Sequence, residues 1–365
     1  MTKYKLGEIC EIVSGSTPKT GIAEYWGGEL KWITPAEISE DSYIITDSVR
    51  KLTESGIKKT GLTPLPKGTV ILSSRAPIGK VAIAGCEMYC NQGFKNLICT
   101  KKINNRYLYW FLKGNTAYLN SLGRGATFKE ISKQIVSGIE INVPDMNQQM
   151  QAVENLEKVW RIIQLRKQEL QKGDELIKAR FVEMFGDPVL NPLRWDVKPV
   201  IDICDCMVPG RDKPKSFTGA IPWITIDDLI VNSTTFRSKQ ELGLTEAEIG
   251  EVKRKTIPVG SVIMSCVGNL GICSIAGNEM IINQQLHSFQ CHSEINNVFL
   301  MYYLGQRKDY MEKQASSTTV LYMNKSVCNS IPVIIPDLEL QEQFSDFVKQ
   351  VDKSKVTKQI DSHIS

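Results

Sequence analysis

The chain has 365 residues, of which 42% are hydrophobic and 23% are charged, a composition that predicts a folded protein with two or three domains and excludes a disordered one. The formal net charge is only +4, so a nucleic-acid partner is permitted but not required. No apolar run approaches the roughly 18 residues of a membrane span, and the first residues lack a secretory apolar stretch, so we expect a cytoplasmic protein.

The first part of the chain, residues 1–144, contains short β-type runs between turn residues. Examples are TVILSS, KVAIAG and IEINV, which Gly, Pro and Asn separate. The segment RYLYWFLKG has the spacing of a short helix. This mixture predicts an α+β domain.

The next segment, residues 145–186, predicts one long amphipathic helix that acts as a spacer. It has no proline between Met146 and Phe185, and Gly173 is its one glycine there. Apolar residues recur every three or four positions and predict a coiled-coil-like seam: Met150, Val153, Leu156, Trp160, Ile163, Leu170, Ile177 and Phe181. About 40 residues in a helix would extend ~60 Å.

The remainder of the chain repeats this pattern at an offset of 192 residues. Between 66–99 and 258–291, 14 of 34 aligned positions are identical without a gap. The matched pairs include Pro66 with Pro258, Gly79 with Gly271, Gly85 with Gly277 and Asn91 with Asn283. The sequence therefore predicts a second α+β domain at 187–336 and a second helical spacer at 337–365.

The second spacer has its own apolar stripe and is shorter than the first. The stripe consists of Phe344, Phe347, Val348, Val351, Val356 and Ile360. Because a lone helix leaves such a stripe uncovered, we expect the two helices to pair antiparallel, giving a pseudo-twofold dumbbell of two domains. Residue 365 corresponds to 173 in the first copy, so the counterpart of 174–186 is missing, which leaves open whether the first helix is paired along its whole length.

No catalytic motif was found in the sequence. There is no GxxxxGK[ST] phosphate loop and no GxGxxG after a strand, and the three histidines lack a partner for nucleophilic catalysis. The ten cysteines form no zinc-ligand pattern, so we expect reduced, mostly buried thiols and no metal site. The sequence thus predicts a non-enzymatic protein.

An ordered set of motifs carries a likeness to a known family. These motifs are GSTPKT, KWITPAEI, LPKGTVILSSRAPIGKVAI, NQGFKNL and FVEMFGDP. With the duplication, the chain resembles the specificity subunit of a type I restriction–modification system. The resemblance implies that each domain reads one half of a bipartite DNA site.

The same resemblance implies partners that carry the chemistry. Two modification subunits would bring S-adenosylmethionine and methylate adenine N6, and a motor–nuclease subunit using ATP and Mg²⁺ is expected to join for restriction. No cofactor is expected in this chain. Two other readings stay open: the recognition part of a self-contained restriction or methylation enzyme, and a coiled-coil scaffold that binds no DNA.

Polar and basic loop residues are the candidates for DNA contact, since such side chains bind base edges and phosphates. In the first domain they are Ser16, Thr17, Lys19, Arg75, Lys80, Asn91, Gln92, Lys95, Arg124 and Lys129. In the second domain they are Arg211, Lys213, Lys215, Asn269, Asn283, Gln284, His287, Thr318, Thr319, Asn324 and Lys325. The pairs shared by both copies, Asn91-Gln92 and Asn283-Gln284, fit a structural role better than a sequence-specific one.

Overall fold

The computed structural model describes residues 1–125, 129–210, 212–317 and 320–364, and the side chains of all these residues except 317 and 354–364. The chain divides into two compact units, Met1–Arg166 and Lys167–Ser365. Each unit is described by itself below.

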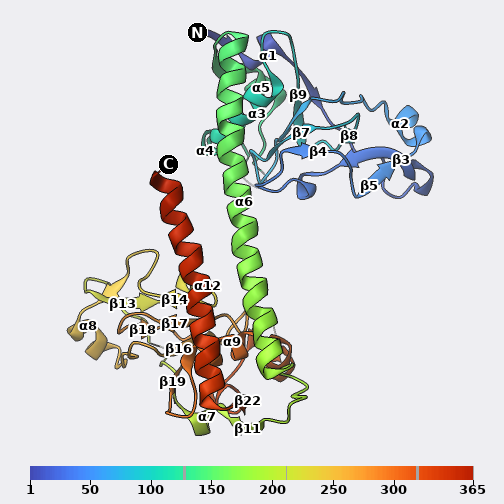
Figure 1. Cartoon of the computed structure of the whole chain (residues 1–365). Helices are drawn as coiled ribbons and strands as arrows, with labels where there is room; N and C mark the ends of the chain where they lie inside the picture. The colour runs from blue at the N-terminus through green and yellow to red at the C-terminus, as the bar shows by residue number, and fades with distance from the viewer. Residues whose placement is uncertain (126–128, 211, 318–319, 365) are drawn as a thin grey trace. The chain divides into compact units, whose positions relative to one another are not determined.

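Unit 1 alternates short strands with short helices and ends in the first part of the long helix α6 (Figure 1). Its strands are β1 (Thr2–Lys5), β2 (Cys10–Ser14), β3 (Trp26–Ile33), β4 (Ile44–Ile45), β5 (Arg50–Leu52), β6 (Val70–Ser73), β7 (Val81–Ala84), β8 (Tyr89–Cys90), β9 (Phe94–Cys99) and β10 (Glu140–Val143). Its helices are α1 (Leu6–Ile9), η1 (Ala23–Tyr25), η2 (Pro35–Glu37), α2 (Glu54–Thr60), α3 (Asn105–Gly114), α4 (Thr116–Ser121), α5 (Lys133–Gly138) and α6 (Met146–Phe185).

The centre of unit 1 is a five-stranded sheet in the order β2-β9-β6-β7-β4. Strand β6 is buried along its whole length because both faces of the sheet are covered. Val70 and Leu72 belong to the apolar cluster that includes helix α3, while Ile71 belongs to a second cluster on the other face. A three-stranded sheet, β5-β3-β8, and the pair β1-β10 complete the unit.

Unit 2 repeats the main elements of unit 1 in the same order and adds one more pair of strands. Its strands are β11 (Asp196–Pro199), β12 (Cys204–Met207), β13 (Ile221–Ile224), β14 (Thr234–Thr235), β15 (Gly243–Leu244), β16 (Val262–Ser265), β17 (Cys273–Ala276), β18 (Ile281–Ile282), β19 (Leu286–Cys291), β20 (Ser316–Ser317), β21 (Leu321–Tyr322) and β22 (Pro332–Ile335). Its helices are α7 (Val200–Ile203), η3 (Ile226–Asp228), α8 (Glu246–Glu251), α9 (Asn297–Gly305), α10 (Lys308–Gln314), α11 (Lys325–Asn329) and α12 (Leu338–Ile364).

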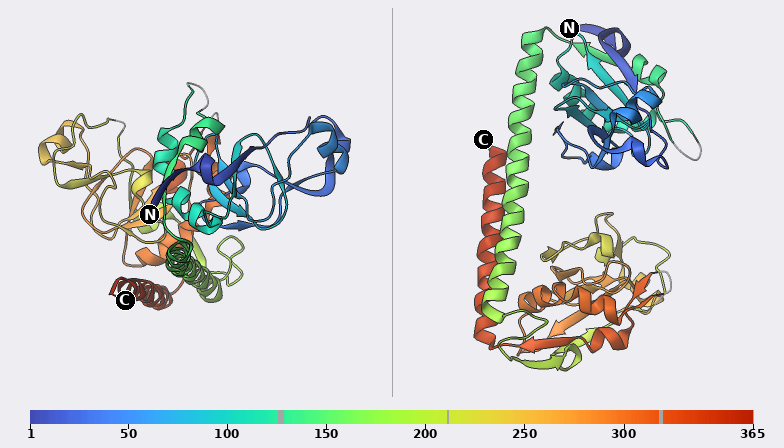
Figure 2. Two further views of the ribbon diagram at one scale, coloured as in Figure 1. Left: turned by 90° about the horizontal axis from the view of Figure 1, so that it is seen from above. Right: turned by 90° about the vertical axis from the view of Figure 1, so that its right-hand side faces the viewer.

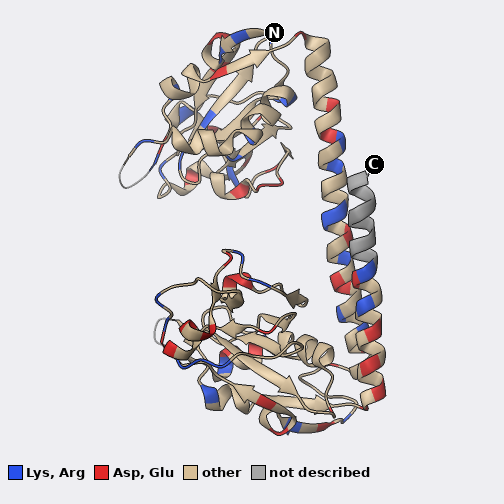
Figure 3. Cartoon of the chain, turned by 90° about the vertical axis from the view of Figure 1, so that its left-hand side faces the viewer, with Lys and Arg blue, Asp and Glu red and all other residues tan. Residues whose placement is uncertain are grey.

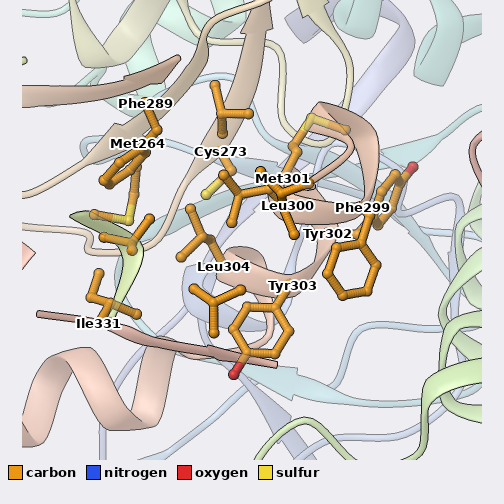
Figure 4. Packing of buried hydrophobic residues seen from close by; sticks show 14 of the residues in the cluster. Met264, Cys273, Phe289, Phe299, Leu300, Met301, Tyr302, Tyr303, Leu304 and Ile331 are labelled. Atoms are coloured by element: carbon orange, nitrogen blue, oxygen red, sulfur yellow. The ribbon is translucent and has the colours of Figure 1, made fainter. Parts of the chain in front are cut away.

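The sheets of unit 2 match those of unit 1 strand for strand. The five-stranded sheet has the order β12-β19-β16-β17-β14, the three-stranded sheet the order β15-β13-β18, and β11 pairs with β22. Apolar side chains from β16, β17, β19 and α9 point into one core, where Met264, Phe289 and Leu300 are labelled in Figure 4. The predicted α+β fold in two tandem copies is confirmed, whereas the domain limits at 144, 186 and 336 stay predictions.

Both predicted long helices are present, and in unit 2 they contact each other. The last turns of α6 lie beside the first turns of α12 (Figure 2), with the Phe181 and Phe344 rings 5.3 Å apart and the Phe185 and Phe344 rings 5.6 Å apart. Helix α6 ends where Gly186 takes a φ of 77°, a conformation that favours glycine. Residues of both charge signs occur along α6 (Figure 3), as expected for a helix with a solvated surface.

The predicted seam residues differ in burial. Val153, Ile177, Phe181, Phe344 and Val348 are buried, and Phe347, Val351, Leu170 and Trp160 are partly buried, whereas Met150, Leu156 and Ile163 are exposed. The Trp160 ring lies 5.4 Å from that of Tyr43, so it packs on the domain of its own unit. The side chains of Val356 and Ile360 lie outside the described residues. Pairing along the whole seam therefore stays a prediction.

A buried glutamine near the start of each long helix joins that helix to the domain that precedes it. In unit 1, Gln149 Nε2 donates to the Pro144 and Lys102 carbonyls at 2.9 and 3.1 Å, and Asn104 N–H donates to Gln149 Oε1 at 2.8 Å. In unit 2, Gln341 makes the same three bonds, to the Pro336 and Glu294 carbonyls and from Asn296 N–H. The duplication thus extends to the hydrogen bonds that join helix and domain.

Candidate nucleic-acid interface

The loop between β6 and β7 has a frame set by one serine. Ser73 Oγ donates to the Pro77 carbonyl and accepts from Lys80 N–H, both at 2.8 Å. Gly79 N–H donates to the Ser73 carbonyl at 3.1 Å, and Gly79 has a φ of 92°. The three residues at the loop tip, 75–77, are left exposed.

Unit 2 builds the same frame from Ser265. Its Oγ donates to the Asn269 carbonyl at 2.6 Å and accepts from Ile272 N–H at 2.8 Å. Gly271 N–H donates to the Ser265 carbonyl at 3.2 Å, with a φ of 76°. The two units therefore hold different tip residues, Arg-Ala-Pro and Val-Gly-Asn, within the same set of frame hydrogen bonds. The tip backbones themselves differ, since the Ala76-Pro77 peptide bond is cis and Gly268 has a φ of 72°.

A second segment lies against this loop in each unit. In unit 1, Arg124 and Glu130 exchange backbone hydrogen bonds of 3.0 and 2.9 Å, and Ile131 N–H donates to the Ser74 carbonyl at 2.9 Å. In unit 2, strands β20 and β21 pair, and Met323 N–H donates to the Cys266 carbonyl at 2.9 Å. Loop and hairpin thus form one surface in each unit, built from segments distant in sequence.

Three charged residues of unit 1 meet on this surface. Arg75 Nε donates to Glu130 Oε2 at 3.0 Å, and the buried Lys95 Nζ donates to Glu130 Oε1 at 3.1 Å. Burial tends to raise the pKa of Glu130, but the hydrogen bonds and charges of Arg75 and Lys95 outweigh it, so that pKa lies below its usual value. The carboxylate therefore stays ionised between two cations.

Some of the other unit 1 candidates are held by hydrogen bonds within the unit, and the rest are exposed basic residues. Thr17 donates to Gln92 Oε1, and Ser16 N–H donates to the Cys90 carbonyl at 3.0 Å, which brings segments 16–19 and 90–92 together. Asn91 Oδ1 accepts from Gly93 N–H at 2.9 Å and so forms the turn itself. Lys80 Nζ donates to the Pro35 carbonyl, whereas Lys19, Arg124 and Lys129 are exposed.

The second unit places its candidates differently. Asn283 is buried and accepts from Gln285 N–H, which repeats the turn made by Asn91, and the partly buried Gln284 has an Oε1 atom with no hydrogen-bond partner among the described residues. Asn324 caps α11 through Val327 N–H. The exposed candidates are Lys213, Lys215, Asn269, Asn324 and Lys325, whereas Arg211, Thr318 and Thr319 lie outside the described residues.

His287 lies in the interior and has no exposed surface. Its Nε2 is 3.1 Å from Asn329 Oδ1, and burial lowers its pKa to about 4. A side chain without exposed surface does not reach a base edge, so we leave His287 out of the proposed interface.

Sequence reasoning missed two residues on these surfaces. Glu130 is acidic and so falls outside the polar and basic residue types chosen for DNA contact, although it contacts two of the basic ones. Lys308 begins helix α10 and so falls outside the loops, yet its Nζ donates to Asn269 Oδ1 at 2.9 Å. Neither residue has a sequence signal that would have identified it.

Among the described residues, no group of three or more His, Cys, Asp or Glu side chains is arranged to hold a metal ion. No described helix has both the length and the apolar surface to cross a membrane.

The sequence of the chain is similar to those of known proteins. A family model described as "Type I restriction modification DNA specificity domain" matches residues 1–172 and 192–365. The type I restriction enzyme MjaIX specificity subunit of Methanocaldococcus jannaschii is 32% identical over 279 residues, which cover 69% of this chain and 64% of that protein. The EcoR124I/EcoR124II specificity subunit of Escherichia coli is 26% identical over 160 residues, 42% of this chain and 39% of that protein.

Solved structures show the same fold at low sequence identity. The type I restriction–modification S subunit from M. genitalium has a TM-score of 0.57 and 12% identity, covering 99% of this chain and 91% of that chain. A chain from a structural study of complex assembly and conformational transition in the type I R-M system has a TM-score of 0.52 and 16% identity, covering 98% and 91%.

Proposed function

Since the chain belongs to the type I restriction–modification DNA specificity family and carries that domain twice, we propose that it is the non-catalytic subunit that reads a bipartite DNA site. Each unit reads one half-site with its β6–β7 or β16–β17 loop and the neighbouring hairpin. Partner subunits supply the chemistry: modification subunits with S-adenosylmethionine, and restriction subunits with ATP and Mg²⁺.

One observation carries this proposal: the two units share the hydrogen bonds that frame this loop but place different residues at its tip. The Ser73 and Ser265 hydrogen bonds keep the loops alike, while 75–77 and 267–269 share no residue. Protein side chains read sequence through base edges, so different tips on one frame read different half-sites. The bound site is therefore expected to be asymmetric.

The test uses the full chain produced together with its modification subunits. Methylation mapping of host DNA, with and without this gene, is expected to reveal a split adenine-methylated motif that disappears on deletion. The logarithm of the binding constant for a duplex with that motif is expected to fall linearly with the logarithm of the salt concentration. Scrambled DNA is expected to bind more weakly at each salt concentration. Methyl transfer by the purified chain alone, or an unchanged methylation map, would contradict the proposal.

A further inference from the structure

We propose that Arg75 reads a guanine in the half-site bound by unit 1, and that Glu130 and Lys95 orient it for this contact. The inference rests on the proposed DNA-reading function and adds a base identity to one position of the site.

The geometry leaves one edge of the Arg75 guanidinium available. Its Nε is bound to Glu130, and its two terminal amino groups have no acceptor among the described residues. The side chain is 46% exposed, while that of Lys95 is only 9% exposed. Two parallel N–H groups on an arginine match the O6 and N7 acceptors of guanine in the major groove.

Lys95 and Glu130 act as the support for this arginine. Lys95 Nζ contacts both Glu130 Oε1 at 3.1 Å and Ser74 Oγ at 3.3 Å, so the buried ammonium holds the carboxylate from beneath. Because Glu130 has one oxygen on each cation, the arginine is fixed at Nε before DNA arrives. Fixing a long side chain in advance reduces the entropy lost on binding.

Unit 2 carries none of these three residues but keeps the backbone bridge between loop and hairpin. At the 192-residue offset, Arg75, Lys95 and Glu130 correspond to Val267, His287 and Tyr322. The bridge between residues 75 and 130 is nevertheless repeated between Val267 and Tyr322. The ion network is therefore not required to hold the hairpin on the loop.

The three differences agree with one another in chemical terms. Without a carboxylate at 322, a buried lysine at 287 would have no counter-charge, and the uncharged His287 bonds to Asn329 instead. Loss of the arginine, its orienting acid and the supporting base as a set is expected if the set serves base recognition. We therefore expect no arginine-read guanine at the matching position of the other half-site.

The experiment uses the full chain with its modification subunits and duplexes carrying the mapped motif. Each base pair of the unit 1 half-site is replaced in turn, and binding of wild type and Arg75→Ala is compared by competition. In wild type, replacing one guanine is expected to weaken binding by about 5- to 150-fold, the discrimination typical of one bidentate pair. In Arg75→Ala that preference is expected to vanish, with the other positions of both half-sites still read.

Arg106→Ala is the matched control. Arg106 is 50% exposed and pairs with Glu157 at 3.3 Å, so it has similar exposure and a similar ion pair, but it lies on α3. Arg106→Ala is expected to show the same base preferences as wild type at every position of both half-sites. Glu130→Gln keeps the shape of the support but removes its charge, so it is expected to reduce the guanine preference at the same position.

The outcomes separate the two proposals. If wild type reads a split motif that Arg75→Ala leaves intact, or if Arg75→Ala weakens binding equally on all sequences, the inference is wrong and the proposed function stands. If wild type shows no sequence preference with its partners present, the proposed function fails and the inference fails with it.

Discussion

His287 is expected to make unit 2 less stable as the pH falls from 6.5 towards 4. The imidazole is buried in the sheet beneath the proposed interface, with burial lowering its pKa from 6.5 to about 4. The unfolded chain binds a proton in this range while the folded chain does not, so acid favours unfolding. The stability that the neutral His287 contributes is fully present above pH 6.5 and is lost progressively as the pH falls from 6.5 towards 4.

The magnitude follows from the two pKa values. With 6.5 for the unfolded and about 4 for the folded state, the free energy of unfolding is expected to drop by about 2 kcal/mol between pH 7.5 and pH 5 from this group. In His287→Gln that part of the pH dependence is expected to vanish, because glutamine does not titrate. The quantity to compare is the slope of the free energy of unfolding against pH. A constant difference in stability between wild type and His287→Gln does not affect that slope.

The assay must resolve one unit from the other. The chain is equilibrated in urea at pH 5 to 7.5, then given a brief deuterium pulse at one fixed pH, and peptides are weighed by mass spectrometry. Peptides from β19 report unit 2, and peptides from β9 report unit 1 as the control, since the substitution does not alter that unit. Equal pH slopes for β19 in wild type and His287→Gln would refute the reasoning.

Three further substitutions test the fold in the same urea assay. Gln149→Ala is expected to lower the stability of unit 1 by roughly 2–4 kcal/mol, because three backbone groups lose a buried partner, whereas the exposed Gln148→Ala should change it by less than about 0.5 kcal/mol. Phe344→Ala is expected to lower the stability of unit 2 by about 3–5 kcal/mol, since a fully buried ring on Phe181 is removed, and a loss under about 1 kcal/mol would contradict this packing. Gly79→Ala is expected to destabilise unit 1 by about 1–3 kcal/mol, because φ is 92° and the new Cβ would lie 2.9 Å from Thr116 Cγ2; an unchanged urea midpoint would show that the loop relaxes.

Repetition in the sequence predicted much of the fold. The identities between 66–99 and 258–291 lie in β6–β9 and β16–β19, where buried strands and turn glycines restrict substitution. The long helix was predicted almost to the residue, since proline is absent from Met146 to Phe185 and glycine ends it. Strand order was not predictable, because pairings such as β2 with β9 join residues that local patterns do not relate.

The candidate interface was only partly predictable, for a reason that lies in burial. Residue type alone does not distinguish an exposed Arg75 from a buried His287, although both are polar and lie in the repeated region. Exposure depends on which segment covers a strand, and the segment that contains Glu130 lies 55 residues after Arg75 in the chain. Trp160 shows the same effect, since the stripe predicted for helix pairing partly packs on Tyr43 of its own unit.

The duplicated frame allows the two units to carry different loop tips on one fold. The residues that set the frame are serines, positive-φ glycines and buried glutamines, and each recurs at the 192-residue offset with the same hydrogen bonds. None of these bonds involves the tip residues' side chains, so a tip can change without loss of the loop. The buried lysine and its carboxylate must change together, because a buried lysine without a carboxylate is costly. Specificity in this chain is therefore expected to change in sets of contacting residues, one exposed and one or two beneath it, and single exchanges at the tip are expected to weaken recognition more often than to redirect it.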